Sequence, residues 1–172
     1  MKKNIVLIGM PGVGKSTAGV ILAKVMGFEF VDVDLVIQRS EKRLLSQIIE
    51  EEGVDGFIEI ENKVNASLFV EDSVISTGGS VVYGTKAMEH LSKIGVIVYI
   101  RLPFETLEQR LNDILGRGVI LREGQTLKDL YEERVPLYEK FAHVTVDEAG
   151  LGIEQTVLGI IEGYNRYLKD RR

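Results

Sequence analysis

The stretch Gly9-Met10-Pro11-Gly12-Val13-Gly14-Lys15-Ser16 decides how this chain folds. It follows a short apolar run at residues 4–8 and precedes a run of helical period at residues 17–26. Its fixed positions fit the pattern G-x-x-x-x-G-K-[ST], in the strand-before, helix-after context that supports such a match. We therefore expect a phosphate-binding loop, the P-loop, between the first strand and the first helix.

The residue types of this loop suit the binding of a triphosphate. Glycines let successive backbone N–H groups turn toward one anion, and the following helix adds the positive end of its dipole. Lys15 can reach the β- and γ-phosphates, and the Ser16 hydroxyl can ligate Mg²⁺. A plain glycine-rich turn with a surface lysine is the alternative, but all four fixed positions are present in the expected context. The predicted nucleotide contacts in the loop are Gly12, Val13, Gly14, Lys15, Ser16 and Thr17.

Composition places the chain among ordinary soluble proteins. Its 172 residues suit one domain spanning residues 1–172, with 45% hydrophobic and 27% charged residues. A net charge of −5 argues against a nucleic-acid binder, and the absence of cysteine excludes disulfides and thiolate catalysis. No apolar stretch approaches the ~20 residues of a membrane span, and the first apolar run is too short for a signal peptide. We expect a cytoplasmic monomer that acts on a small molecule.

Short apolar runs alternate with helix-length segments along the chain. Runs rich in Val and Ile predict buried parallel strands at residues 4–8, 29–33, 73–76 and 96–101, with a weaker fifth at 143–147. Helices are predicted at residues 15–26, 35–40, 44–52, 57–69, 85–93, 104–115, 126–141 and 153–169. This alternation predicts an α/β fold, a three-layer α/β/α domain around a five-stranded parallel sheet that is covered on both faces.

One connection departs from this periodic pattern. Residues 112–124 contain three glycines and two arginines, Arg117 and Arg122, and show neither a helical nor a strand period. We predict that this segment is a mobile, positively charged lid that closes over the triphosphate and excludes water. An ordinary surface loop is the alternative.

Two carboxylates, Asp32 and Asp34, come at the end of the second predicted strand. Ligands of open α/β sheets bind outside the carboxyl ends of the strands, and strand alternation places residues two apart on one side. We expect both to face the P-loop, one helping to hold Mg²⁺ and the other accepting the proton of an attacking hydroxyl. A pair of helix N-cap acids, with Asp34 directly before Leu35, is a compatible alternative.

Glycines also follow the third predicted strand, in the sequence Thr77-Gly78-Gly79-Ser80. Consecutive glycines allow a substrate to approach the backbone closely, and a tight turn is the alternative. Farther along, Arg134 lies in a predicted helix together with Pro136 and Tyr138. Taken alone, Arg134 is more typical of a solvated helix-surface charge than of a functional residue.

Together these motifs resemble the shikimate kinase family over nearly the whole chain. The family has a P-loop that ends in Gly-Lys-Ser-Thr, an Asp-x-Asp after the second strand and a glycine run after the third. It also has a lid bearing arginine and an Arg-x-Pro-Leu-Tyr motif, matched here by residues 134–138. The resemblance implies sheet order 2-3-1-4-5 and MgATP-dependent phosphorylation of the 3-hydroxyl of shikimate, in aromatic amino-acid synthesis.

The resemblance further implies a role for each matched residue on the ATP side. Lys15 and Ser16 would hold the phosphates and Mg²⁺, with Asp32 near the metal. Arg110 would lie over the adenine, and Arg117 in the lid would contact the transferring phosphate.

On the acceptor side, the resemblance implies a substrate site on helices within residues 35–69. Asp34 would hydrogen-bond the acceptor hydroxyl and act as base, Gly78 and Gly79 would line the site, and Arg134 would bind the shikimate carboxylate.

Three departures from the family pattern fall at the acceptor site and the lid. In the family's Phe-Arg-x-x-Glu, the arginine helps to clamp the carboxylate, but Ile58 stands at that position here. The third glycine is Ser80, and the lid's Arg-Pro-Leu-Leu reads Arg117-Gly118-Val119-Ile120. A charge-assisted hydrogen bond is worth about 1.5–3 kcal/mol, so losing one arginine predicts roughly tenfold to hundreds-fold weaker shikimate binding.

These departures leave alternatives open. Arg122, Lys63 or Arg39 could compensate for the missing arginine. The pocket could instead be retuned, with Glu59 and Glu61, for a less anionic acceptor such as a polyol or an amino alcohol. A nucleotide-binding module without catalysis is a third reading, against which the second carboxylate of the Asp-x-Asp pair argues.

Overall fold

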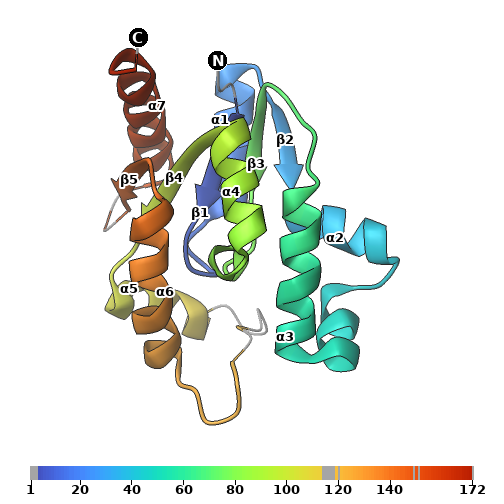
Figure 1. Ribbon diagram of the computed structural model, residues 1–172. Coiled ribbons are helices and arrows are strands. Elements are labelled where there is room, and N and C mark those ends of the chain that lie inside the picture. The colour runs from blue at the N-terminus through green and yellow to red at the C-terminus, as the bar shows by residue number, and fades with distance from the viewer. Residues whose placement is uncertain (1–3, 114–118, 120, 149, 151, 172) are drawn as a thin grey trace.

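A five-stranded parallel sheet forms the centre of the molecule (Figure 1). The computed structural model describes residues 4–113, 119, 121–148, 150 and 152–171. The strand order β2-β3-β1-β4-β5 confirms the predicted topology. The strands are β1 (Asn4–Ile8), β2 (Glu29–Asp32), β3 (Ser73–Ser76), β4 (Gly95–Arg101) and β5 (Val144–Asp147).

The central strand β1 is buried along its whole length, because helices cover both faces of the sheet. Ile5 of β1 is in register with Val74 of β3 on one side and with Val96 of β4 on the other. Strands buried on both faces have continuous apolar sequences, which is why these runs were detectable in the sequence.

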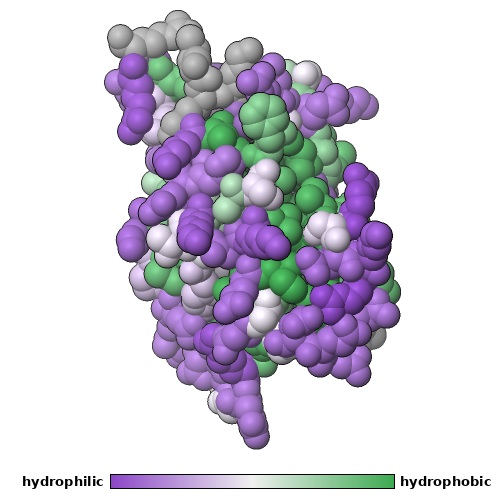
Figure 2. Space-filling model, turned by 45° about the vertical axis from the view of Figure 1, so that its right-hand side comes forward, coloured by the Kyte–Doolittle hydropathy of each residue, from purple (hydrophilic) through white to green (hydrophobic). Residues whose placement is uncertain are grey.

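The helices complete the two outer layers (Figure 1). Helices α1 and α7 pack together on one face of the sheet, and α4 and α6 lie on the other, with α3 beside α4. On the face seen in Figure 2, hydrophilic side chains surround a group of apolar side chains. The helices are α1 (Lys15–Met26), α2 (Val33–Glu41), α3 (Leu45–Ala66), α4 (Thr85–Ile94), α5 (Phe104–Asp113), α6 (Leu127–Phe141) and α7 (Ile153–Lys169), with a 3₁₀ turn η1 (Val81–Tyr83) before α4.

Helix α3 contains the two helices that were predicted at residues 44–52 and 57–69. They form one span from Leu45 to Ala66 and meet at a kink, and the second helix ends earlier than predicted. Gly53 interrupts the span with φ 71° and ψ −178°, so the chain bends there and then resumes helical geometry. Backbone angles of this kind are essentially confined to glycine. The two predicted segments are therefore the two arms of one kinked element.

Candidate active site

The P-loop shapes a small hollow at the carboxyl end of β1. Gly14 is the N-cap of α1 with φ 95°, and the loop closes through a hydrogen bond from the Val13 amide to the Met10 carbonyl. A positive φ at Gly14 suits a residue without a Cβ. We name this space of about 190 Å³ the phosphate hollow. Its lining is Pro11, Gly12, Gly14, Lys15, Ser16, Thr17, Asp34, Thr77, Gly78, Gly79 and Leu111.

Lys15 lies buried against the floor of the phosphate hollow. Its ammonium donates to the carbonyls of Gly9 at 2.8 Å and Met10 at 2.9 Å, which fix its position. Burial lowers the pKa of Lys15 to about 8, and the negative charge of Asp34 opposes this shift. A positive group held in this way is placed to interact with phosphate oxygens.

Two oxygen groups at the edge of the hollow suit a magnesium ion. The Ser16 hydroxyl lies 3.2 Å from the Asp32 Oδ2 atom and 3.2 Å from the Ser76 hydroxyl. Mg²⁺ prefers hard oxygen ligands and retains several waters, so one hydroxyl and one nearby carboxylate are a fitting protein contribution. Among the described residues, no group of three or more His, Cys, Asp or Glu side chains could hold a metal alone.

The two aspartates reach the site by a route other than the predicted one. Strand β2 ends at Asp32, and α2 begins at Val33, so Asp34 lies in the first helical turn rather than on the strand. Asp32, not Asp34, caps the helix, because its Oδ1 atom accepts a hydrogen bond from the Asp34 amide at 3.0 Å. The argument from strand alternation was wrong. Asp34 nevertheless borders the phosphate hollow, and Asp32 contacts Ser16.

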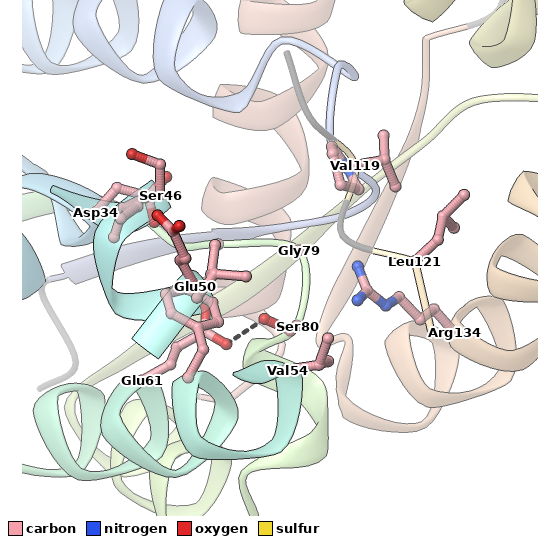
Figure 3. Close-up of a pocket in the computed structure, with 15 residues that line it drawn as sticks. Asp34, Ser46, Glu50, Val54, Glu61, Gly79, Ser80, Val119, Leu121 and Arg134 are labelled. Carbon is pink, nitrogen blue, oxygen red and sulfur yellow. Dashed lines mark hydrogen bonds between the residues drawn. The ribbon is translucent and has the colours of Figure 1, made fainter. Parts of the chain in front are cut away.

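A second, larger cavity adjoins the phosphate hollow (Figure 3). We name this space of about 730 Å³ the acceptor cavity. The two spaces share Pro11, Asp34, Gly78 and Gly79, so Asp34 lies where one opens into the other. The cavity is lined by Pro11, Asp34, Leu45, Ser46, Ile49, Glu50, Val54, Phe57, Glu61, Gly78, Gly79, Ser80, Val119, Leu121 and Arg134.

The glycine turn after β3 packs closely against side chains that line the acceptor cavity. A Cβ on Gly78 would lie 2.2 Å from Glu61 Oε1, so no larger residue fits there without movement. The Tyr138 hydroxyl donates to the Gly79 carbonyl at 2.5 Å, and the Tyr138 ring stacks on Tyr99 with centroids 5.1 Å apart. Tyr138, which was not among the predicted site residues, therefore anchors the turn. Its place in the Arg-x-Pro-Leu-Tyr motif was the available signal.

Arg134 is buried, contrary to the expectation of a solvated surface charge. Only 5% of its surface is exposed, and it lines the acceptor cavity from α6 (Figure 3). Its Nε atom donates to the Tyr83 hydroxyl at 3.3 Å, and its guanidinium lies 5.3 Å from the Tyr83 ring centroid. Within the described part of the chain it forms no ion pair, so its charge is available to an anion in the cavity.

Glu61, which was named from the sequence only for the retuned-pocket alternative, lines the acceptor cavity. It is 1% exposed, and its Oε2 atom accepts a hydrogen bond of 2.5 Å from the Ser80 hydroxyl. Burial raises the pKa of Glu61 to about 7, and the Ser80 hydrogen bond opposes this shift. An acidic residue in the apolar stripe of α3, four residues after Phe57, was the signal in the sequence.

The position of Ile58 lies beside the acceptor cavity rather than in its lining. Ile58 lines a narrow side hollow together with Tyr83, Arg122 and Arg134. Arg122 is thus the one of the three proposed compensating cations that lines a space with Arg134, although it pairs with Asp55 at 2.8 Å. The two others are placed elsewhere: Lys63 is exposed, and Arg39 lines a separate groove beside β2.

The remaining predicted residues concern the nucleotide base and the lid. Arg110 pairs through Nη2 with Glu148 Oε1 at 2.7 Å on a face near the end of β5. Arg117 and most of the predicted lid lie outside the described residues. Of the described lid residues, Val119 and Leu121 line the acceptor cavity.

The fold and the paired cavities define a P-loop phosphotransferase that acts on a small acceptor. Within the described residues, no helix is both long and apolar enough to span a membrane. The model of the family described as shikimate kinase matches residues 11–164. The chain belongs to the shikimate kinase family.

Similarity to individual proteins agrees with this assignment. The chain is 38% identical to a shikimate kinase from Thermodesulfovibrio yellowstonii over 95% of this chain and 96% of that protein. The structure of shikimate kinase from Acinetobacter baumannii in complex with shikimate superposes with a TM-score of 0.82 at 33% identity, covering 93% of this chain and 91% of that one. A gluconokinase from Sinorhizobium meliloti, at 16% identity and a TM-score of 0.56 over 98% and 95% of the chains, shares the fold alone.

Proposed function

We propose that this chain transfers the γ-phosphoryl group of MgATP to the 3-hydroxyl of shikimate. The observation that carries the proposal is the position of Asp34, at the junction between the phosphate hollow and the acceptor cavity. A carboxylate there can hydrogen-bond an acceptor hydroxyl while the hydroxyl oxygen faces the γ-phosphorus. Positioning of this kind is the larger part of catalysis in phosphoryl transfer.

Asp34 is the proposed general base. Burial raises its pKa, the neighbouring Asp32 adds to the effect, and Lys15 opposes it. A higher pKa makes the ionised carboxylate a stronger proton acceptor. In the proposed step, the hydroxyl proton passes to Asp34, the hydroxyl oxygen bonds to phosphorus, and the bond to the leaving ADP oxygen breaks.

The P-loop residues are proposed to hold the triphosphate during this step. Lys15 and the amides of Gly12–Gly14 would neutralise and orient the phosphate oxygens. Ser16 and Asp32 would hold Mg²⁺, which would offset the negative charge of the phosphate groups. Arg110 is proposed to contact the nucleotide base. Arg117 is proposed to contact the transferring phosphate.

Arg134 is the proposed anchor for the shikimate carboxylate. A buried guanidinium without a carboxylate partner among the described residues favours an anionic ligand, since burial of an unpaired charge is costly. The glycine turn, held by Tyr138, brings the backbone against the same cavity. The retuned-pocket alternative is favoured by Ile58, which leaves one arginine where the family has two.

The test is a coupled ADP-release assay on wild type, Arg134→Lys and Ile58→Arg, with shikimate beside a panel of polyols and amino alcohols. We expect turnover of shikimate by wild type and a rise in KM of about tenfold or more in Arg134→Lys, because bidentate pairing is lost. A large gain in kcat/KM for shikimate in Ile58→Arg, with loss of activity toward another acceptor, would identify that acceptor as the native substrate. ATP binding without turnover of any alcohol would indicate a non-catalytic module.

A further inference from the structure

Glu61 stands out among the residues of the acceptor cavity because one of its two carboxyl oxygens has no partner among the described residues. Oε2 accepts a hydrogen bond from Ser80, whereas the buried Oε1 forms none within the part of the chain that the structure describes. Leaving a buried polar atom without a hydrogen bond destabilises the fold, so such atoms call for an explanation. The carboxyl group lines the cavity directly, as Figure 3 shows.

A second carboxyl group lies close to the first. A Cβ on Gly78 would be 2.2 Å from Glu61 Oε1 and 3.3 Å from Asp34 Oδ1, so the two acids flank one α-carbon. Two carboxylates in a shared, water-poor site do not both ionise readily. Because Asp34 must be ionised to act as base, the proton of the pair belongs on Glu61.

The positive and negative charges around the Glu61 carboxyl group nearly cancel. Glu61 faces Lys15 from α1, Asp34 from α2 and Arg134 from α6, while Glu50 lies on its own helix at the cavity. The other elements packed on α3 make their polar contacts away from Glu61. In η1, the Tyr83 hydroxyl donates to Glu133 and accepts from Arg134. In α4, the Ala87 amide donates to Asn62 of α3.

Ile58 and Ser80, the two acceptor-site residues that depart from the family pattern, both affect the carboxyl group of Glu61. Ser80 supplies its hydrogen bond, and Ile58 stands three residues before Glu61 on α3. Residues three apart on a helix are neighbours, so a cation at position 58 would stabilise an ionised Glu61. Isoleucine cannot do so.

We propose that Glu61, held by Ser80, sets the charge that the acceptor cavity accepts: an anionic acceptor binds together with a proton that Glu61 takes from solvent. The inference rests on the proposed function and deepens it. Proton uptake compensates for the positive charge that is missing at Ile58, and it allows one arginine to suffice for one carboxylate. Burial raises the pKa of Glu61 to about 7, which places the uptake in the neutral range.

The test compares shikimate with its methyl ester, a neutral ligand of nearly the same shape. Their dissociation constants are measured by isothermal titration without nucleotide between pH 6 and pH 8.5, in two buffers of different ionisation enthalpy. We expect the shikimate Kd to rise by about tenfold or more across this range, with proton uptake, and the ester Kd to change less than about twofold. The Glu61→Gln variant should lose both the pH dependence and the proton uptake.

The pH at which the shikimate Kd begins to rise is here called the break. Two further variants should shift the break in opposite directions. Ser80→Ala removes a donor that stabilises the carboxylate, so the break should shift to higher pH. Ile58→Arg adds a cation one turn away, so the break should shift to lower pH. A merely structural contact between Ser80 and Glu61 would change affinity without moving the break.

A direct titration separates this inference from the proposed function. The Glu61 carboxyl, identified by its loss in Glu61→Gln, is followed by ¹³C NMR in the free protein and should titrate near neutral pH. Titration in the ordinary range of glutamate, or equal pH dependence in wild type and Glu61→Gln, would overturn the inference while leaving shikimate as the acceptor. Failure of both ligands to bind at any pH would overturn the proposed function, and the inference with it.

Discussion

Asp34 lies where the phosphate hollow opens into the acceptor cavity, and its surroundings shift the pKa of its carboxyl group. Burial and Asp32 raise its pKa, so activity should be lost as the pH falls through that raised value and should be present above it. Asp34→Asn should lower kcat by about 10²- to 10⁴-fold and remove this acidic limb, because the proton acceptor is gone.

Steady-state kinetics between pH 5 and pH 9 check this expectation. Nucleotide affinity, measured separately by isothermal titration, should change little in Asp34→Asn. The matched control is Asp32→Asn, which should raise the Mg²⁺ requirement and retain an acidic limb. An Asp34→Asn enzyme with a kcat within about threefold of wild type would exclude Asp34 as the base.

The buried acid Glu61 also predicts how stability varies with pH. Its pKa in the folded protein is raised to about 7 from an ordinary value of 4.5. The folded state therefore binds the proton more tightly, and this stabilisation is present below about pH 4.5 and is lost as the pH rises through about 7. The shift corresponds to roughly 3 kcal/mol.

Urea unfolding of wild type and Glu61→Gln at several pH values measures this contribution. The stability of wild type relative to Glu61→Gln should fall between pH 5 and pH 8, because only the wild type carries the titrating carboxyl. Comparing the difference between the two proteins cancels the contribution of other groups. Parallel stability curves for the two proteins would contradict the assignment of this raised pKa to Glu61.

Arg134 shows both the power and the limit of residue-level prediction. Its motif indicated a role, yet its burial was not anticipated, because an arginine taken alone is usually exposed to solvent. The stripe Leu130, Arg134 and Tyr138, at spacings of four, is the buried line of α6 and would have placed the arginine inside. Side-chain partners such as Ser80 for Glu61 join segments far apart in the chain and follow only from the packed fold.

At the scale of elements, prediction succeeded where a local pattern decides the structure. Each of the five strands was located to within one residue at either end. The three inner strands β1, β3 and β4 are buried, which favours apolar sequences, whereas the edge strands β2 and β5 are partly exposed. Failure came at boundaries set by a single residue. Asp32 ends β2 and caps α2, which no periodicity indicates. The two helices predicted within α3 are present and meet at the kink of Gly53.

The kink of α3 carries the next prediction. Gly53 has φ 71° with open space around its α-carbon, so alanine there would be strained by its backbone rather than by a clash. Gly53→Ala should lower the free energy of unfolding by about 1–3 kcal/mol. It should also raise the KM for the acceptor more than that for ATP, because the segments on both sides of the bend line the acceptor cavity.

Gly152→Ala is the matched control for this substitution. Gly152 also has open space around its α-carbon, but its φ of −71° is accessible to alanine. Chemical denaturation should show a loss of no more than about 1 kcal/mol, which reflects only that alanine is a poorer N-cap than glycine. Equal destabilisation by the two substitutions would mean that the bend at Gly53 is not under backbone constraint.

For the molecule as a whole, the two adjoining spaces should act as separate ligand sites within one folding unit. Most of the proposed nucleotide contacts come from the P-loop and α1, whereas Arg134 of α6 lines the acceptor cavity and its side hollow. A ligand that binds the folded state alone stabilises it by RT ln(1 + [L]/Kd), about 2.7 kcal/mol at a hundredfold excess over Kd. For a chain of this length, that raises Tm by roughly 5–11 °C.

Thermal unfolding with MgADP or with shikimate tests this separation through two substitutions. Ser16→Ala should reduce the Tm shift caused by MgADP and preserve the shift caused by shikimate. The reason is that Ser16 lines the phosphate hollow and not the acceptor cavity. Arg134→Ala should do the reverse. Each variant serves as the control for the other, since a general loss of stability lowers the starting Tm without choosing between ligands. If Arg134→Ala reduced both shifts equally, the acceptor cavity would not be the shikimate site, and the carboxylate anchor would have to lie elsewhere.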